Sequence, residues 1–286
     1  MTEIASYSWW NLIPQHMDPT LIHIGSFPVR WYGLMYLAAF FTCYQVMWRT
    51  ILRDKIKVSK ENLDDLSAWI IAGILIGARL GYVAFYNLGY YVDHPLDAIL
   101  PFSFDGGFHF TGISGMSFHG GLIGAVTGAS ICIIKNKWNY WQWNNLAFMA
   151  APLGYTWGRL GNFINGELYG RTTDSPIGML FPMDKTNHLR HPSQLYEMFF
   201  EGVFLFIILQ WLYRKPSFKT HMMSLYLIGY GSVRFVIEFF REPDAQIGLN
   251  ALGLSRGQLL CMTMIVTGVV LWALREFFLG KAKPAK

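Results

Sequence analysis

Long apolar runs, separated by short polar and basic stretches, dominate the chain. A membrane-spanning helix needs about 20 mostly apolar residues, far more than a buried strand requires. Runs of this kind predict seven spanning helices, over residues 31–48, 66–86, 117–134, 143–163, 193–213, 222–240 and 257–279. The pattern therefore predicts an all-α integral membrane protein with a single polytopic membrane domain over residues 1–286.

The basic residues between these runs predict how the chain is oriented. Fourteen of the 23 lysines and arginines lie in residues 49–65, 135–142, 214–221 and the tail from Arg275, whereas residues 87–116 contain none. Because lysine and arginine accumulate in cytoplasmic loops, we expect the N-terminus outside and the C-terminus in the cytoplasm. The segments expected outside are long enough to build a small cap: the N-terminal stretch and loops 87–116, 164–192 and 241–256.

The composition agrees with a membrane protein and excludes other classes. Charged residues make up 14% of the chain and hydrophobic residues 53%, whereas soluble domains have about 25% charged residues. The net charge of +5 is spread in short blocks between apolar runs, so nucleic acid is not expected as a partner. All three cysteines lie inside apolar runs, which argues against a disulfide framework and a Cys/His zinc site. Residues 1–29 lack the pattern of a removable signal peptide, so the first apolar run is expected to stay in the mature chain.

Glycines recur every four residues inside several apolar runs. The series are Gly73, Gly77 and Gly81; Gly120, Gly124 and Gly128; and Gly154 and Gly158. Small residues at this spacing let helix backbones approach closely in lipid, where no hydrophobic effect drives association. We therefore expect most of these glycines to be packing positions, and Gly77→Leu to loosen the bundle.

The segment Gly158–Gly170 brings many polar groups to the end of the fourth apolar run. A charge at membrane depth costs roughly 2.5–3.5 kcal/mol, so Arg159 is a candidate functional residue. An isolated arginine would more simply extend to the lipid headgroups, but Asn162 lies on the same helical face, and Asn165 and Glu167 follow. A guanidinium also binds phosphate in a bidentate way, which suits a lipid headgroup.

Other polar residues are candidates with a competing structural interpretation. His119 is either held by a backbone carbonyl or acts as a general base near neutral pH. Tyr230, Arg234 and Glu238 follow at intervals of four and line one helix face, as a structural charge pair or as part of a phosphate clamp with Arg159. The weaker candidates are Arg79, the interfacial aromatic Tyr32, and Glu197 and Glu201 near a helix start at Pro192.

Some functions are disfavoured by what the sequence lacks. It has no HExxH, P-loop or CxxC motif. A transporter or channel that uses intramembrane Arg/Glu pairs is an alternative, although the chain shows no internal repeat. An intramembrane protease would need a nucleophile and a base from different spans, and Ser114 with its flanking glycines matches such a motif only weakly.

The polar segment resembles a known family motif. Residues Gly158–Gly170 are similar to the diagnostic motif of the bacterial prolipoprotein diacylglyceryl transferases. The resemblance continues in order along nearly the whole chain, through Trp31–Tyr36, Ser117–Leu122, Arg190–Glu197 and Tyr230–Phe239.

The resemblance implies an enzyme of the bacterial inner membrane, with seven helices, a small periplasmic head and an active site facing the periplasm. Such an enzyme would transfer the diacylglyceryl group of phosphatidylglycerol to the lipobox cysteine of a preprolipoprotein. The product is a thioether, glycerol phosphate is released, and this is the first step of lipoprotein maturation. By resemblance, Arg159 binds the phospholipid and Arg234 is a second essential arginine. Functionally sensitive positions of the family fall on Tyr32, His119, Asn162, Glu167, Gly170, Tyr230 and Glu238.

This reaction suggests a role for each charged candidate. A cysteine thiol with a pKa of about 8.5 is mostly protonated at neutral pH, so a base is useful, and His119 is the candidate. Arg159 and Arg234 would hold the phosphate as charge develops on it. We expect no cofactor and no metal ion, because two guanidiniums can do this work. The residues that would orient the arginines and the glycerol headgroup are Asn162, Tyr230, Glu167 and Glu238.

Overall fold

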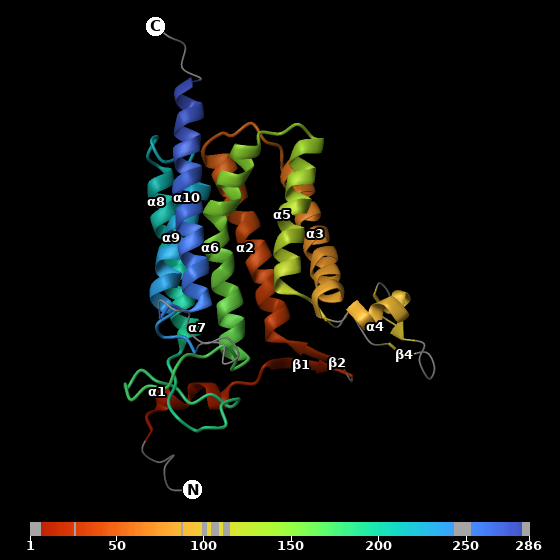
Figure 1. The fold of residues 1–286 in the computed structure, drawn as a ribbon, viewed down its shortest axis with the longest axis vertical. Helices are drawn as coiled ribbons and strands as arrows, with labels where there is room; N and C mark the ends of the chain where they lie inside the picture. The colour runs from red at the N-terminus through yellow and green to blue at the C-terminus, as the bar shows by residue number, and fades with distance from the viewer. Residues whose placement is uncertain are drawn as a thin grey trace. The chain divides into compact units, whose positions relative to one another are not determined.

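The chain is mostly helical (Figure 1). The computed structural model describes residues 7–25, 27–86, 88–98, 102–103, 109–110, 115–242 and 253–281. The long helices are α2 (Trp31–Arg53), α3 (Lys60–Tyr86), α5 (Phe118–Lys135), α6 (Tyr140–Ile164), α9 (Met222–Ile237) and α10 (Arg256–Lys281). A further continuous helical stretch consists of α7 (Ser193–Tyr196), the π-helical η4 (Glu197–Phe204) and α8 (Leu205–Tyr213).

The remaining elements are short. They are α1 (Trp9–Leu12), η2 (Ile13–His16), α4 (Leu88–Asp93), η3 (Pro95–Ala98), and the strands β1 (Thr20–Ile24), β2 (Phe27–Arg30), β3 (Phe102–Ser103) and β4 (His109–Phe110). Strands β1 and β2 form an antiparallel hairpin, in which Thr20 pairs with Arg30 and Ile24 with Phe27. The hairpin leads directly into α2, and β3 and β4 form a second antiparallel pair.

Several helices have the length and composition of membrane spans. Within the described part of the chain, four stretches are long and apolar enough to cross a bilayer: Lys60–Tyr86, Phe118–Lys135, Ser193–Tyr213 and Arg256–Phe277. Large apolar side chains such as Phe41, Leu80 and Val266 point outward and are more than half exposed. Such a surface is unfavourable in water and favourable in lipid, so the structure is that of a membrane protein. Helices α2, α6 and α9 occupy the other three expected ranges, and their crossing of the bilayer stays a prediction.

The chain divides into two compact units. One comprises Met1–Arg49 with Asn144–Lys286, and the other comprises Thr50–Trp143. The first contains most of α2 and α6 together with α7 to α10, and the second contains α3, α4 and α5. This division does not test the expectation of a single membrane domain over residues 1–286, which stays a prediction.

The predicted glycine contacts lie between α3 and α5, which run side by side (Figure 1). A Cβ atom at Gly77 would lie 2.7 Å from the Cα of Gly124, and one at Gly120 would lie 2.9 Å from the Cα of Gly81. Real Cβ atoms do not come this close to backbone atoms, so the two backbones touch only because side chains are absent. The expectation that these glycines are packing positions is therefore confirmed.

The third glycine series behaves differently at its two positions. A Cβ at Gly154 of α6 would collide with the Sγ of Cys43 of α2, as a packing glycine should. Gly158 has no atom within 4 Å of its would-be Cβ, other than its own helix backbone. Gly158 is therefore an exception among glycines of which most were expected to be packing positions, because the helix face at this residue borders open space.

Arg79 connects α3 to the segment that precedes α5. Its Nε donates to the Ala98 carbonyl at 2.8 Å, and its two terminal nitrogens donate to the carbonyls of Asp97 at 2.5 Å and Gly115 at 3.3 Å. The guanidinium also lies over the ring of Tyr91, 5.2 Å from its centre. These contacts favour the structural interpretation of Arg79, since irregular backbone near a membrane needs hydrogen-bond partners.

In the first unit, α1 packs on the loop that follows α6. The buried Asn11 donates to the Gly178 carbonyl at 2.6 Å, and Leu180 donates its N–H to the Asn11 carbonyl at 2.8 Å. An apolar cluster of Phe163, Met179 and Phe181 lies beneath these contacts. Small buried polar contacts and aromatic packing therefore give this loop a defined conformation.

Arg190 is the charged centre of the same loop. Its Nε lies 2.6 Å from Asp184, one terminal nitrogen lies 2.9 Å from Glu242, and its backbone pairs with Met179. Burial alone would raise the pKa of Asp184, but hydrogen bonds from Arg190 and Thr186 hold that pKa below its usual value. The ionised form of Asp184 is thus favoured in the folded loop.

The close approach of α3 and α5 predicts a stability effect at position 77. Gly77→Ala places a Cβ against the backbone of Gly124 and should lower the free energy of unfolding by about 1–3 kcal/mol. Gly89→Ala in α4 is the matched control, because nothing lies within 4 Å of its would-be Cβ. Unfolding titrations in mixed micelles measure both variants, and equal stability of the two would contradict the packing role.

The Asp184–Arg190 pair predicts a pH dependence. The pKa of Asp184 is lower in the folded protein than in the unfolded chain, where it is about 3.9. The contribution of ionised Asp184 to the stability of the folded state is therefore fully present above the unfolded pKa, and is lost as pH falls through the folded pKa. Asp184→Asn should therefore destabilise the loop by about 1–3 kcal/mol at pH 7. In acid, where Asp184 is protonated, the wild type and the variant should be equally stable. Hydrogen exchange of the paired amides of Met179 and Arg190 reports on this loop, and Asp174→Asn at an exposed position should leave it unchanged.

Candidate active site

Three guanidiniums and three carboxylates meet inside the first unit. Helix α6 supplies Arg159, η4 supplies Glu197 and Glu201, and α9 with the residues just after it supplies Arg234, Glu238 and Arg241. We call these six residues the charged cluster. It brings together residues from separate apolar runs, including Arg159 and Arg234, which both contact Glu197. The phosphate clamp expected of these two arginines stays a prediction.

Glu197 is the centre of the charged cluster. Its side chain is 0% exposed, and each of its oxygens lies close to guanidinium nitrogens. Oε2 lies 2.6 Å from the Nε of Arg159, and Oε1 lies 2.9 Å from Arg234 and 2.8 Å from Arg241. The carboxylate therefore joins Arg159 and Arg234 through its two oxygens.

The π-helical turn that carries Glu197 lies close against α6. A Cβ at Gly202 of η4 would collide with the Oγ1 of Thr156 of α6, so this glycine permits the contact. Wide π-helical turns are rare and are frequently found at functional sites. Here η4 carries both Glu197 and Glu201, whose side chains are fully buried.

Arg159 is held by polar groups of its own helix and the turn after it. Its Nε lies 2.6 Å from the Tyr155 hydroxyl, and NH1 donates to the Asn162 carbonyl oxygen at 3.2 Å. The Asn162 amide in turn donates to Glu167 at 2.9 Å, and Asn165 donates to the same carboxylate oxygen at 3.2 Å. The expectation that Arg159 and Asn162 share a helix face is confirmed. The side-chain amide of Asn162 contacts both Arg159 and Glu167 and so connects the two charged groups.

Arg234 is held by carboxylates on three sides. Besides Glu197, it contacts Glu238 at 3.1 Å in the expected i, i+4 pair and Glu201 at 3.6 Å. Glu238 also accepts a hydrogen bond from the Ser255 hydroxyl at 3.1 Å, just before α10. The ring of Tyr230 lies edge-on to that of Tyr155, with centres 5.6 Å apart. Tyr230 and Glu238 thus lie beside Arg234, as expected.

The other expected site residues have different surroundings. The ring of Tyr32 packs on Gly161, where a Cβ would lie 2.9 Å from its Cδ2 atom, and its hydroxyl lies 3.2 Å from that of Tyr36. Gly170 accommodates the backbone of Phe240, which leaves no room for a side chain, and pairs with Arg241. His119 is the second residue of α5 in the other compact unit, where its side chain is exposed. The positions of these residues do not test the roles expected of them.

The sequence analysis does not identify Arg241 of the charged cluster or Tyr155, which contacts Arg159, and it gives Glu197 only as a weak candidate. Residue spacing does contain a signal for Arg241 and Tyr155, because Tyr155 precedes Arg159 by four residues and Arg241 follows Glu238 by three. Nothing in the sequence marks the π-helical turn that makes Glu197 central.

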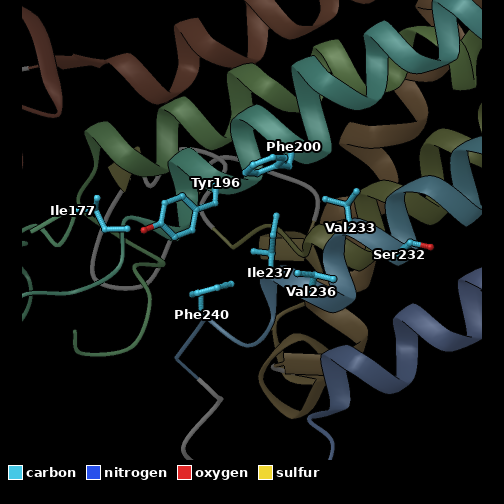
Figure 2. A pocket seen from close by; sticks show the side chains of 8 residues that line it. All are labelled: Ile177, Tyr196, Phe200, Ser232, Val233, Val236, Ile237 and Phe240. Carbon is cyan, nitrogen blue, oxygen red and sulfur yellow. The ribbon is translucent and has the colours of Figure 1, made fainter. Parts of the chain in front are cut away.

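An apolar cavity of about 600 Å³ is lined largely by residues of η4 and α9, two of the elements that carry the charged cluster (Figure 2). Its walls come from η4 and α9 with flanking residues, and include Tyr196, Phe200, Val233, Val236, Ile237 and Phe240. Several lining residues are direct sequence neighbours of charged ones, such as Tyr196 beside Glu197 and Val233 beside Arg234. A ligand with an anionic headgroup and an apolar tail would match both parts.

The comparisons with known proteins agree with one another. The model of the family described as prolipoprotein diacylglyceryl transferase matches residues 19–274. A protein of Chlorobaculum tepidum is 48% identical over 92% of this chain and 91% of its own length. Proteins of Idiomarina loihiensis and Pseudoalteromonas translucida are 43% and 41% identical, over 94% and 91% of this chain and 96% and 94% of their own lengths. All three are named phosphatidylglycerol–prolipoprotein diacylglyceryl transferase. The chain belongs to the prolipoprotein diacylglyceryl transferase family.

Proposed function

We propose that this protein transfers the diacylglyceryl group of phosphatidylglycerol to the lipobox cysteine thiol of preprolipoproteins. The names of its relatives support both substrates. The observation that carries the proposal is the joining of Arg159 and Arg234 through the buried Glu197, next to an apolar cavity. A phosphodiester would bind the guanidiniums and an acyl chain would occupy the cavity.

The reaction forms a carbon–sulfur bond and breaks a carbon–oxygen bond. The cysteine sulfur attacks the terminal glyceryl carbon of the lipid, and the electron pair of the broken bond stays on the phosphate oxygen, so that glycerol phosphate leaves. The thiol proton passes to a base, for which His119 is the candidate. Arg159 and Arg234 stabilise the charge that develops on the phosphate in a site from which water is largely excluded.

The supporting residues would hold this arrangement in place. Asn162 and Glu167 orient Arg159 through the amide contacts described above, and Tyr230 and Glu238 do the same for Arg234. Tyr32 and Gly170 would line the approach to the headgroup. Rigidly held guanidiniums cost little reorganisation as the charge develops.

The proposal includes an arrangement in the membrane. All seven long helical stretches would cross the bacterial inner membrane, with the N-terminus outside and the C-terminus in the cytoplasm. The segments outside, including the loop centred on Arg190, would form a periplasmic head that receives the lipobox peptide. The distribution of lysine and arginine supports this orientation.

The transporter or channel alternative is not supported by the comparisons. The relatives that match along most of the chain are named as transferases. Intramembrane Arg/Glu pairs are common to both classes, and the arginines here converge on one buried carboxylate next to an apolar cavity.

Loss of either arginine should abolish transfer. Arg159→Ala and Arg234→Ala each remove a guanidinium from the proposed phosphate site, which should lower the rate at least about a hundredfold. Mass spectrometry of a lipobox peptide incubated with phosphatidylglycerol and the purified protein measures the added diacylglyceryl mass. Arg214→Ala, at an exposed position after α8, is the matched control. Full activity in either test variant removes that arginine from the mechanism, and peptide cleavage without mass addition refutes the proposed function.

Loss of His119 should have a pH-dependent effect. His119→Gln should slow transfer most at low pH, because above about pH 8.5 the thiol ionises without a base. Rates of the same assay across pH, with His16→Gln at an exposed position as control, measure the effect. A profile parallel to that of the wild type would assign His119 to positioning.

A further inference from the structure

Glu201 has an environment unlike that of the other carboxylates in the charged cluster. Its side chain is 0% exposed, and neither carboxylate oxygen accepts a hydrogen bond of ordinary geometry from the described residues; the nearest hydroxyl that can contact it is that of Tyr155. The nearest cationic atom is NH1 of Arg234 at 3.6 Å, and that same nitrogen lies closer to Glu197, at 2.9 Å. Glu201 is therefore buried without the strong contacts that an ionised carboxylate requires.

Ionising such a group is costly. A buried charge is tolerated when it is paired and hydrogen-bonded, as Glu197 is with three guanidiniums. Glu201 lacks these partners and lies one helical turn from Glu197, so a second negative charge would also repel the first. Two carboxylates that share one cation in a buried site favour one charge and one proton between them.

The charge balance of the cluster points the same way. Three guanidiniums and three ionised carboxylates sum to zero, because three positive charges cancel three negative ones. A phosphodiester with one negative charge would then leave an uncompensated buried charge. If Glu201 is neutral, the cluster carries one positive charge, which matches the phosphodiester. Glu167 is not in this sum, because its contacts are to amides in the turn after α6.

We propose that Glu201 is a protonated, neutral carboxylic acid in the resting site, and that its proton gives the arginines the single net positive charge that receives the anionic lipid headgroup. This rests on the proposed function for the identity of the ligand. Glu201 is thus a positioning residue that acts through Arg234. Loss of its proton would neutralise the cluster and weaken binding of the anionic lipid.

The groups facing Glu201 come from all the elements packed on it. They are Glu197 on η4, Tyr155 and Arg159 on α6, Tyr226, Tyr230 and Arg234 on α9, and Cys261 on α10. Of these, only the two arginines are cationic, and both also contact Glu197. The set thus offers Glu201 no cation of its own.

Infrared difference spectroscopy tests the protonation state without any substrate. The spectrum of wild type minus the isosteric variant Glu201→Gln should contain the carbonyl band of a protonated carboxylic acid. The matched control, wild type minus Glu61→Gln at an exposed position, should contain carboxylate bands alone. Carboxylate bands alone for Glu201 overturn the proposal. If the variant does not fold, a pH titration of the wild-type spectrum tests the same protonation state. The band of the buried carboxylic acid must then disappear as pH rises, and its absence at all pH values would overturn the proposal.

Lipid binding tests the consequence. In nanodiscs of phosphatidylcholine, the affinity of the wild type for labelled phosphatidylglycerol should fall as pH rises, approaching about tenfold per pH unit for one linked proton. Glu201→Gln should lack this fall, because its side chain cannot ionise. The same pH dependence in both proteins overturns the proposed role of Glu201. If the infrared band is present but neither protein binds phosphatidylglycerol or modifies the peptide, the protonation of Glu201 stands and the proposed function fails.

Discussion

The contact of one buried carboxylate with three guanidiniums is the interaction on which this structure depends. Removing these groups from water is costly, and the cost is offset only while all partners are in place. Glu197, Arg159 and Arg234 come from three different helical elements, and Arg241 comes from the segment after α9. None of these elements could keep its charge buried alone. The charged cluster therefore fixes how α6, η4 and α9 pack, in a lipid environment where apolar contacts discriminate poorly between packings.

The apolar cavity and the charged cluster together indicate what kind of ligand the site would fit. Glu197 and Arg234 belong to the charged cluster, and their sequence neighbours Tyr196 and Val233 line the apolar cavity. An amphiphile can satisfy both at once, whereas a free ion would leave the apolar walls exposed. The side chains of the charged cluster are at most 17% exposed, which strengthens the electrostatic contacts among them.

Much of this could be predicted from residue spacing, because local periodicity determines which side chains share a helix face. The pairs Arg159–Asn162 and Arg234–Glu238 and the glycine contacts between α3 and α5 are of this kind. The central role of Glu197 could not be predicted, because it depends on a π-helical turn and on partners far away in sequence. Arg241 likewise reaches the cluster through backbone pairing of its segment with Gly170. Gly158 shows the limit of the spacing argument, since its position in a glycine series does not guarantee a neighbouring helix.

The glycine contacts also have a mechanical consequence for His119. Where two helices meet through side chains, changes of rotamer can absorb small displacements. Between α3 and α5 the backbones themselves touch at Gly73, Gly77, Gly120 and Gly124, so there is nothing between them that can adjust. The pair must therefore move as a rigid body. His119 lies at the first turn of α5, next to Gly120, so a displacement of the backbone that carries its side chain must also displace α3.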